Sequence, residues 1–274
     1  MGVRPSDGCP GGTGAPGGDR APRSVSAADV IADEVRGVRP AEVPGRLCGT
    51  VVRLLPVTGA SVSLRGEGLP VRLCASGERA AWLAELQATL GEGPGEQAGA
   101  TGVAVLAGDL AAGADRWPVF AQEATGVGIR AVYALPLGNA TACFGTLDLY
   151  RETPGVLTGA ELSTARLVAA VVMTALTALP REDAYGEQEE HEDLGDLGDL
   201  GEYEAGVLQR RRPSGLGSAY DTTHQAVGML MAQLGVDADE ALARLRARAF
   251  ACGRTAYEVA RDVVTHRERF DRDR

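Results

Sequence analysis

The sequence predicts an α+β domain, with an antiparallel sheet flanked by helices, followed by a small all-α domain of three helices. Three observations support this fold class. Apolar residues alternate with a period of two in the middle of the 274-residue chain. Helical patterns stand on both sides of that region, and three further short helical patterns fill residues 218–264. We therefore expect a disordered tail over residues 1–25, the α+β domain over 26–180, an acidic linker over 181–217 and the helical domain over 218–274.

The elements of the α+β domain follow from spacing and from turn residues. Apolar residues at three-and-four spacing indicate helices, and alternation between Gly- and Pro-rich clusters indicates strands. The Gly-rich stretch at residues 91–102 fits neither pattern and predicts a loop. In chain order, we expect helices near residues 30–35 and 47–55, strands over 60–64 and 71–75, a helix over 80–90, a strand over 103–106 and a helix over 117–124.

A hairpin and a long helix complete this domain. Gly138-Asn139 separates two alternating runs, residues 131–137 and 144–150, and predicts their turn. Thr158 and Glu161 have the spacing of a capping box, which opens the final helix. The apolar face of that helix is wider than one sheet would cover, so we expect part of it to pack against a second subunit.

The C-terminal domain has the clearest helix boundaries. Its short loops force the helices to pack together, and small residues at the expected contacts allow close approach. Those contact residues are Ala226, Ala241, Ala249 and Ala260. The boundary signals are Gly235 after the first helix, a capping box of Asp237 and Glu240 before the second, Gly253 after it, and a capping box of Thr255 and Glu258 before the third.

Charge and cysteine content point to an intracellular protein. The net charge is −10, but residues 182–209 alone hold 11 acids and no arginine, so the rest of the chain is close to neutral. Five widely spaced cysteines without a C-x-x-C pair fit a reducing compartment. The start lacks a signal-peptide pattern, and no apolar run approaches about 18 residues. We expect a soluble, cytoplasmic protein that does not enter a membrane.

The sequence offers little support for catalysis. The three histidines all lie outside the α+β domain, and no zinc spacing, phosphate loop or nucleophile elbow is present. We expect no enzyme activity, no cofactor and no metal site. Cys48, Cys74 and Cys143 fall within the α+β domain; buried structural thiols are the favoured interpretation, and redox chemistry is the alternative.

The C-terminal domain contains sequence motifs in addition to its helical pattern. It resembles the ANTAR domain, the RNA-binding output module of bacterial transcription antitermination regulators. The resemblance rests on Gln225-Ala226-x-Gly228-x-Leu230-Met231, Asp239-Glu240-Ala241, Leu245-Arg246-x-x-Ala249 and Val259-Ala260-x-Asp262-Val263-Val264.

The preceding domain also resembles a known family. Its sequence is similar to that of the GAF domains that are joined to ANTAR domains in actinobacterial regulators. The resemblance rests on residues 84–94, Asp109-Leu110, Arg116-Trp117-Pro118-x-Phe120, residues 128–132, Leu135-Pro136-Leu137 and residues 145–150.

Together the resemblances imply a signal-responsive antitermination regulator. Two C-terminal domains, joined in a homodimer, would bind paired stem-loops in nascent RNA and prevent a terminator hairpin from forming. The first helix would offer groups to loop bases, and arginines of the other helices would face phosphates. The GAF-like domain could bind a small molecule, although the sequence does not identify the residues of its pocket. The candidate RNA-binding residues are Thr222, Gln225, Gly228, Arg244, Arg248, Arg254 and Arg261.

Other interpretations stay open. The C-terminal domain could belong to a DNA-binding transcription factor with its third helix in a major groove, although Arg254, Tyr257 and Arg261 make a poor base-reading set. It could instead dock a protein partner in a redox or ligand-binding protein. The GAF-like domain could be a dimerisation scaffold alone. The acidic linker could fold back onto the arginines and compete with RNA, or it could act as an extended spacer.

Overall fold

The computed structural model describes residues 26–65, 68–178 and 217–271. The expected tail over 1–25 and nearly all of the expected linker lie outside these residues, and so does the proposed contact between the linker and the arginines.

A five-stranded antiparallel sheet forms the centre of the first domain, in the order β2-β1-β5-β4-β3. This arrangement confirms the predicted fold class. Because helices cover both faces, strand residues that point either way are buried. In β4, Tyr133 and Leu135 join one core cluster while Val132 and Ala134 join the other. The strands are β1 (Gly59–Leu64), β2 (Val71–Ala75), β3 (Val105–Ala107), β4 (Ala131–Gly138) and β5 (Cys143–Arg151).

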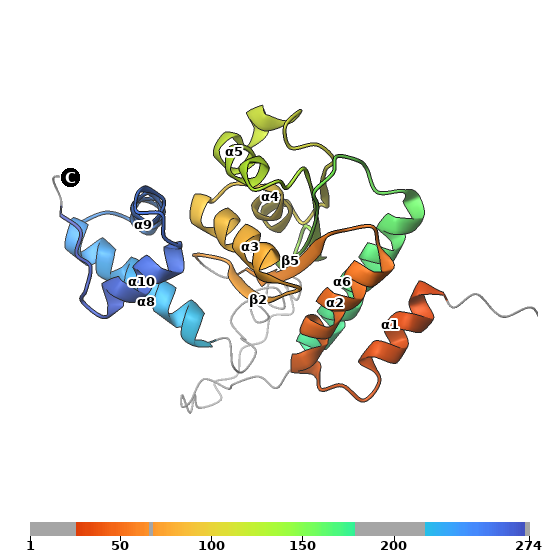
Figure 1. The fold of residues 1–274 in the computed structure, drawn as a ribbon. Coiled ribbons are helices and arrows are strands. Elements are labelled where there is room, and N and C mark those ends of the chain that lie inside the picture. Colours follow the sequence, from red (N-terminus) through yellow and green to blue (C-terminus); the bar gives the residue numbers. More distant parts are fainter. Residues whose placement is uncertain (1–25, 66–67, 179–216, 272–274) are drawn as a thin grey trace, which may run out of the picture.

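Two groups of helices enclose the sheet (Figure 1). One face carries α1 (Ala27–Val35), α2 (Val43–Leu54) and α6 (Gly159–Thr177), with a 3₁₀ turn, Pro40–Glu42, before α2. The other face carries α3 (Glu78–Leu90), α4 (Pro94–Thr101) and α5 (Pro118–Gly126), with a 3₁₀ turn, Ala114–Arg116, before α5.

The loop predicted for residues 91–102 is wrong, because Pro94–Thr101 forms α4. Pro94 occupies the first turn, where its missing amide proton costs nothing. The helix packs its small residues, Gly95, Ala98 and Gly99, into the core. A Cβ atom on Gly95 would lie 2.6 Å from Asp148 Oδ2. Close packing against the sheet therefore overrides the low helix propensity of this stretch.

The hairpin is confirmed, but its predicted two-residue turn is wrong. Strand β4 extends through Gly138 and β5 begins at Cys143, so four residues connect them. Asn139 Oδ1 accepts hydrogen bonds from the amides of Thr141 and Ala142, at 2.9 and 3.0 Å. This side-chain acceptor stabilises the longer loop.

Helix α6 begins with the predicted capping box, in which Thr158 and Glu161 exchange hydrogen bonds. By length and composition this is the one helix of the described chain that could cross a membrane. Here it lies against the sheet, α1 and α2, and Val168 and Val172 are fully buried in the core. These neighbours cover part of its apolar face, Leu167 is 37% exposed, and a second subunit stays a prediction.

The second domain is the predicted bundle of α8 (Gly217–Leu234), α9 (Ala238–Ala251) and α10 (Ala256–Val264). Its predicted contact alanines are all buried. Gly235 and Gly253 adopt positive φ angles of 70° and 62° where the helices stop. The Thr255–Glu258 capping box is present. The predicted box at α9 is only half formed: Asp237 accepts from the Glu240 amide, but the Glu240 carboxylate pairs with Arg244 instead.

The bundle docks on the first domain beside α3, a contact that the sequence did not predict (Figure 1). Leu69, from the loop between β1 and β2, is 2% exposed and completes the core of the bundle. The Ala256 amide donates to Thr89 Oγ1 at 3.0 Å, and Arg246 Nε donates to the Ala88 carbonyl at 3.1 Å. Apolar and polar contacts thus join the two domains.

Candidate nucleic-acid interface and sensor pocket

Helix α8 presents an exposed stripe that contains two of the three candidate residues from this helix. Asp221, Gln225, Gly228 and Ala232 follow one another at three-and-four spacing, and all four are exposed. Thr222 lies at the edge of the stripe and is half-buried. The docking contacts involve α9, α10 and the buried side of α8, so Gln225 and Gly228 remain open to a partner in the docked arrangement.

Gly228 has no packing reason to be a glycine. It lies in the interior of α8, where glycine is about 1 kcal/mol less favourable than alanine. A Cβ atom built on Gly228 would meet no atom of the described chain within 4 Å. Its backbone φ angle is not positive either, so no backbone conformation requires glycine here. Like Gly45 of α2, Gly228 therefore leaves the helix backbone open at the surface.

The two candidate arginines of α9 both pair with carboxylates. Arg244 Nη2 lies 2.6 Å from Glu240 Oε1, one turn earlier on the same helix. Arg248 Nη2 lies 2.7 Å from Oε1 of Glu268, in the segment that follows α10. Its hydrogen bond to Glu268 raises the pKa of the Arg248 guanidinium above its ordinary value. Both guanidinium groups lie at the surface, where ion pairs are weak, so a phosphate could replace the carboxylate.

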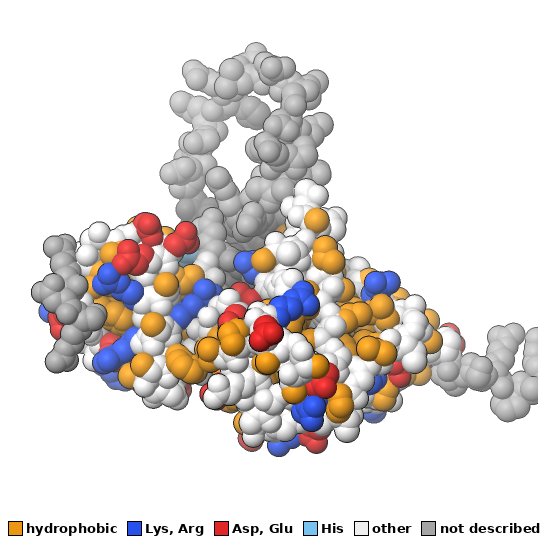
Figure 2. Space-filling view, turned by 90° about the horizontal axis from the view of Figure 1, so that it is seen from above, with side chains coloured by type: hydrophobic (Ala, Val, Ile, Leu, Met, Phe, Trp, Pro, Cys, Tyr) orange, Lys and Arg blue, Asp and Glu red, His pale blue; other side chains and the backbone are white. Residues whose placement is uncertain are grey.

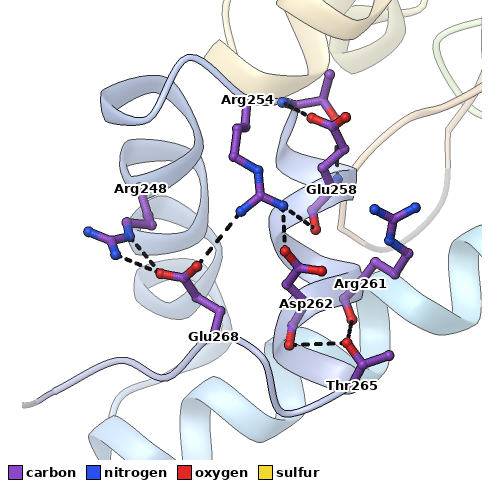
Figure 3. Close-up of polar contacts among 8 residues, drawn as sticks. Arg248, Arg254, Glu258, Arg261, Asp262, Thr265 and Glu268 are labelled. Carbon is purple, nitrogen blue, oxygen red and sulfur yellow. Dashed lines mark hydrogen bonds and ion pairs between the residues drawn. The ribbon is translucent and has the colours of Figure 1, made fainter.

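Arg254 has a structural position between α9 and α10. Figure 3 shows its guanidinium flanked by Asp262 and Glu268. Its Nη2 lies 2.6 Å from Asp262 Oδ2 and 3.2 Å from the Glu258 carbonyl, and its Nη1 lies 3.7 Å from Glu268 Oε2. These contacts tie the interhelical loop to α10 and to the following segment. Replacing Arg254 would therefore disturb the bundle as well as remove a charge.

Arg261 differs from the other three candidate arginines. It is exposed on α10, and its side chain makes no ion pair with any residue of the described ranges. Its guanidinium lies on the opposite side of α10 from Arg248 (Figure 3). The candidate arginines therefore do not converge on one point. Basic side chains are interspersed with acidic and hydrophobic ones on the face of the bundle seen in Figure 2.

The structure adds one candidate that the sequence reasoning missed. Phe250, in the last turn of α9 and two residues after Arg248, is 47% exposed. An exposed aromatic ring suits base stacking. The signal in the sequence is an aromatic residue outside the apolar stripe of a helix, at a position that the three-and-four spacing predicts to face solvent.

A polar pocket lies between the sheet and helices α3 and α4, although the sequence identified no pocket residues. Its volume is about 20 Å³, room for one water molecule. Asp148 Oδ2 accepts a hydrogen bond from Gln87 Nε2 at 2.9 Å, and Gln87 Oε1 accepts from the Gly95 amide at 2.6 Å. The lining residues are Ser63, Leu64, Arg65, Pro70, Ala84, Gln87, Gly95, Glu96, Gly99, Gly145, Thr146 and Asp148.

Asp148 is the electrostatic centre of this pocket. It is 3% exposed, and its Oδ1 atom has no hydrogen-bond partner in the described chain. Burial raises its pKa to about 7, against a lowering contribution from Gln87. Burial also raises the pKa of Glu96, while Arg246 and Arg65 oppose that shift. Arg246 belongs to the docked bundle, so one of the charges that act on Glu96 comes from the second domain.

Comparison with known families matches both domains. Residues 45–176 match the family model described as "GAF domain", and residues 219–264 match the one described as "ANTAR domain". GAF is a signal-sensing domain, and ANTAR is an RNA-binding antitermination domain. No curated protein matches the chain.

Solved structures resemble the first domain. The GAF domain of a phosphoenolpyruvate-protein phosphotransferase from Acinetobacter is 15% identical, covers 54% of this chain and 89% of its own, and superposes with a TM-score of 0.45. The GAF domain region of a putative membrane protein from Geobacter sulfurreducens is 16% identical, covers 50% of this chain and 93% of its own, and has a TM-score of 0.42.

Proposed function

Because the chain joins a GAF domain to an ANTAR domain and so is a GAF-plus-ANTAR regulator, we propose that it is a signal-responsive transcription antitermination regulator. Its α8–α10 bundle binds stem-loops in nascent RNA. It works in the cytoplasm as a homodimer and carries out no catalysis.

The exposed glycine of α8 carries this proposal. Gly228 weakens its helix and serves no contact within the described chain, yet it lies next to Gln225 in an exposed stripe. Close approach of a polyanion backbone or of an unstacked base to the helix explains this residue. Gln225 supplies an amide that can both donate to and accept from a base edge. RNA is read mainly at unstacked loops, where such edges are available.

Arginines and an aromatic ring add to this surface. Arg261 offers a guanidinium without an internal ion pair in the described ranges, and Arg244 and Arg248 can exchange surface carboxylates for phosphate. Phe250 offers an exposed stacking surface on α9. Residues 218–274 hold nine arginines and nine acids, so long-range attraction is weak and affinity depends on local contacts.

Dimerisation would supply the affinity that one bundle lacks. Two weak sites joined in one molecule act through effective concentration, so a pair of stem-loops binds more tightly than one. Binding of both stem-loops would stabilise the RNA form that excludes a terminator hairpin. A signal that changes the pocket of the GAF domain would alter how the bundles dock on that domain, and would thereby change RNA binding.

The experiment measures binding of the full-length protein to tandem RNA stem-loops, a loop-scrambled RNA and duplex DNA over a range of salt concentrations. We expect preference for the intact stem-loops. Gly228→Ala should raise the free energy of unfolding by about 0.5–1 kcal/mol and weaken stem-loop binding by about tenfold, a loss near 1.4 kcal/mol. A gain in stability with a loss in affinity identifies a contact surface.

Two matched variants complete the test. Gly45→Ala changes an exposed glycine of α2 with equally open surroundings, and it should leave RNA binding unchanged. Arg36→Ala removes an exposed charge on the first domain and is compared with Arg261→Ala, which should weaken binding. Equal binding of stem-loop and scrambled RNA, or unchanged affinity in Gly228→Ala, would contradict the proposal. Preference for duplex DNA would support the DNA-binding alternative.

A further inference from the structure

Two cysteine side chains that are distant in the sequence meet on the face of the sheet opposite the pocket. Cys48 lies on α2 and Cys74 on β2, and their Sγ atoms are 3.1 Å apart. Both are free thiols. The other described cysteines have no such partner: the Cys143 thiol donates to the Gly145 carbonyl at 3.3 Å, and Cys252 is exposed on the bundle. This contact joins a helix to the edge strand of the sheet.

The distance is close to that needed for a covalent bond. A disulfide requires about 2.05 Å between sulfurs, so the two atoms need to approach by roughly 1 Å. Strand β2 is at the edge of the sheet and pairs only with β1, with an irregular register between Val62 and Ser63. An edge strand beside a register shift can make a movement of this size more readily than a central strand.

The two thiols have different chemical roles. Cys48 is 0% exposed and packs in the core, whereas Cys74 is partly exposed. The hydrogen bond between the two sulfurs lowers the pKa of Cys74, and Arg72 contributes in the same direction. The same hydrogen bond and burial raise the pKa of Cys48. Cys74 is therefore the accessible, more nucleophilic sulfur, and Cys48 is the partner held next to it.

We propose that Cys48 and Cys74 form an oxidation site that a small hydroperoxide converts to a disulfide. The Cys74 thiolate attacks a peroxide oxygen and breaks the O–O bond, giving a sulfenic acid and, with hydrogen peroxide, hydroxide. The Cys48 sulfur then attacks the Cys74 sulfur, and the sulfenic hydroxyl leaves as water with the Cys48 proton. The dithiol loses two electrons, which reduce one hydrogen peroxide to two waters.

The bond would fix the edge strand to α2. Strand β2 begins two residues after Leu69, the residue that enters the core of the bundle. Oxidation therefore acts on the strand that leads directly from the docking contact. The assignment of this site does not rest on RNA binding and goes beyond the proposed function.

The test treats the reduced full-length chain with hydrogen peroxide, blocks the remaining thiols with an alkylating reagent and maps the peptides by mass spectrometry. We expect a linked pair of peptides that contain Cys48 and Cys74. The mass of the pair should be lower by two hydrogens than the summed mass of the two peptides with free thiols. Cys74 should react about tenfold or more faster than Cys143, because burial raises the pKa of Cys143. Oxidation confined to other cysteines, with both Cys48 and Cys74 still alkylated, would overturn the proposal.

Variants separate the two roles. Cys48→Ser should leave Cys74 as a sulfenic acid that a cyclic dione reagent traps, and Cys74→Ser should prevent both the sulfenic acid and the linked peptides. Cys143→Ser is the matched control from the same domain and should leave the linked pair unchanged. If a variant does not fold, the peptide map of the unaltered chain still shows whether Cys48 and Cys74 become linked. Linkage of Cys74 mainly to Cys143 or Cys252 would also refute the assigned pair.

Discussion

Replacing Asp148 with asparagine tests the electrostatics of the pocket. In the folded chain the carboxyl is buried, and its pKa rises from 3.8 to about 7. Between these two values the folded state holds a proton that the unfolded state has lost, so the free energy of unfolding falls as pH rises through this window. Above pH 7 both states are ionised, and the folded protein carries the full cost of a buried carboxylate. Asparagine mimics the protonated form and does not titrate.

The size of the change in the free energy of unfolding follows from the pKa shift of Asp148. A displacement of about three pKa units corresponds to roughly 4 kcal/mol at its limit. Between pH 5 and pH 8, with a folded pKa of about 7, the wild-type protein should lose roughly 2–3 kcal/mol of stability relative to Asp148→Asn. The variant should therefore gain relative stability steadily up to pH 7 and then reach a plateau.

The assay is denaturant unfolding of both proteins at intervals across this range. For each protein, the free energy of unfolding is plotted against pH. Subtracting one plot from the other removes the contributions of groups that titrate equally in both proteins. Glu96 lies nearby and interacts with Asp148, so the comparison is repeated in a Glu96→Gln background. A difference that stays constant with pH, within about 0.5 kcal/mol, would show that Asp148 is ionised in the folded state. That result would refute the reasoning from burial and an unpartnered oxygen.

Other predictions concern the docking contact, the pocket, the thiol pair and the aromatic ring. Leu69→Ala should cost about 2–5 kcal/mol and increase amide exchange in the bundle, because the side chain completes its core. Gly95→Ala should cost about 1–3 kcal/mol in thermal unfolding, because the new methyl group meets Asp148 and Gln87 at 3.0 Å or less. The Cys48–Cys74 disulfide, spanning 26 positions, should raise the free energy of unfolding by about 3.5 kcal/mol. Phe250→Ala should weaken RNA binding by about 1–3 kcal/mol without lowering stability.

Local signals predicted the elements whose boundaries depend on local chemistry. The capping boxes at Thr158 and Thr255 form as expected, because an N-cap oxygen and an acid three residues later need nothing beyond one turn of helix. The same logic predicted half of the box at Asp237. It failed for Glu240 because Arg244, one turn later, offers a stronger partner for the carboxylate.

Patterns that depend on distant packing were harder to interpret. The Gly-rich stretch of α4 has no helical stripe, since the sheet side of that helix needs small residues instead of large ones. The polar pocket was missed because Gln87 and Asp148 are 61 positions apart. The pairing of Cys48 with Cys74 was missed for the same reason, although both residues were noted individually.

By itself, the sequence determined the order of the two domains, the antiparallel sheet with its flanking helices, the three-helix bundle and the exposed positions of Gln225 and Gly228. These features follow from periodicity, caps and glycine stops, which act over a few residues. Only the tertiary structure decided that α4 is a helix, that Asp148 and Gln87 share a pocket, that Leu69 belongs to the bundle's core and that two thiols meet. Each of these depends on close contact between segments far apart in the chain, and no local pattern records such a contact.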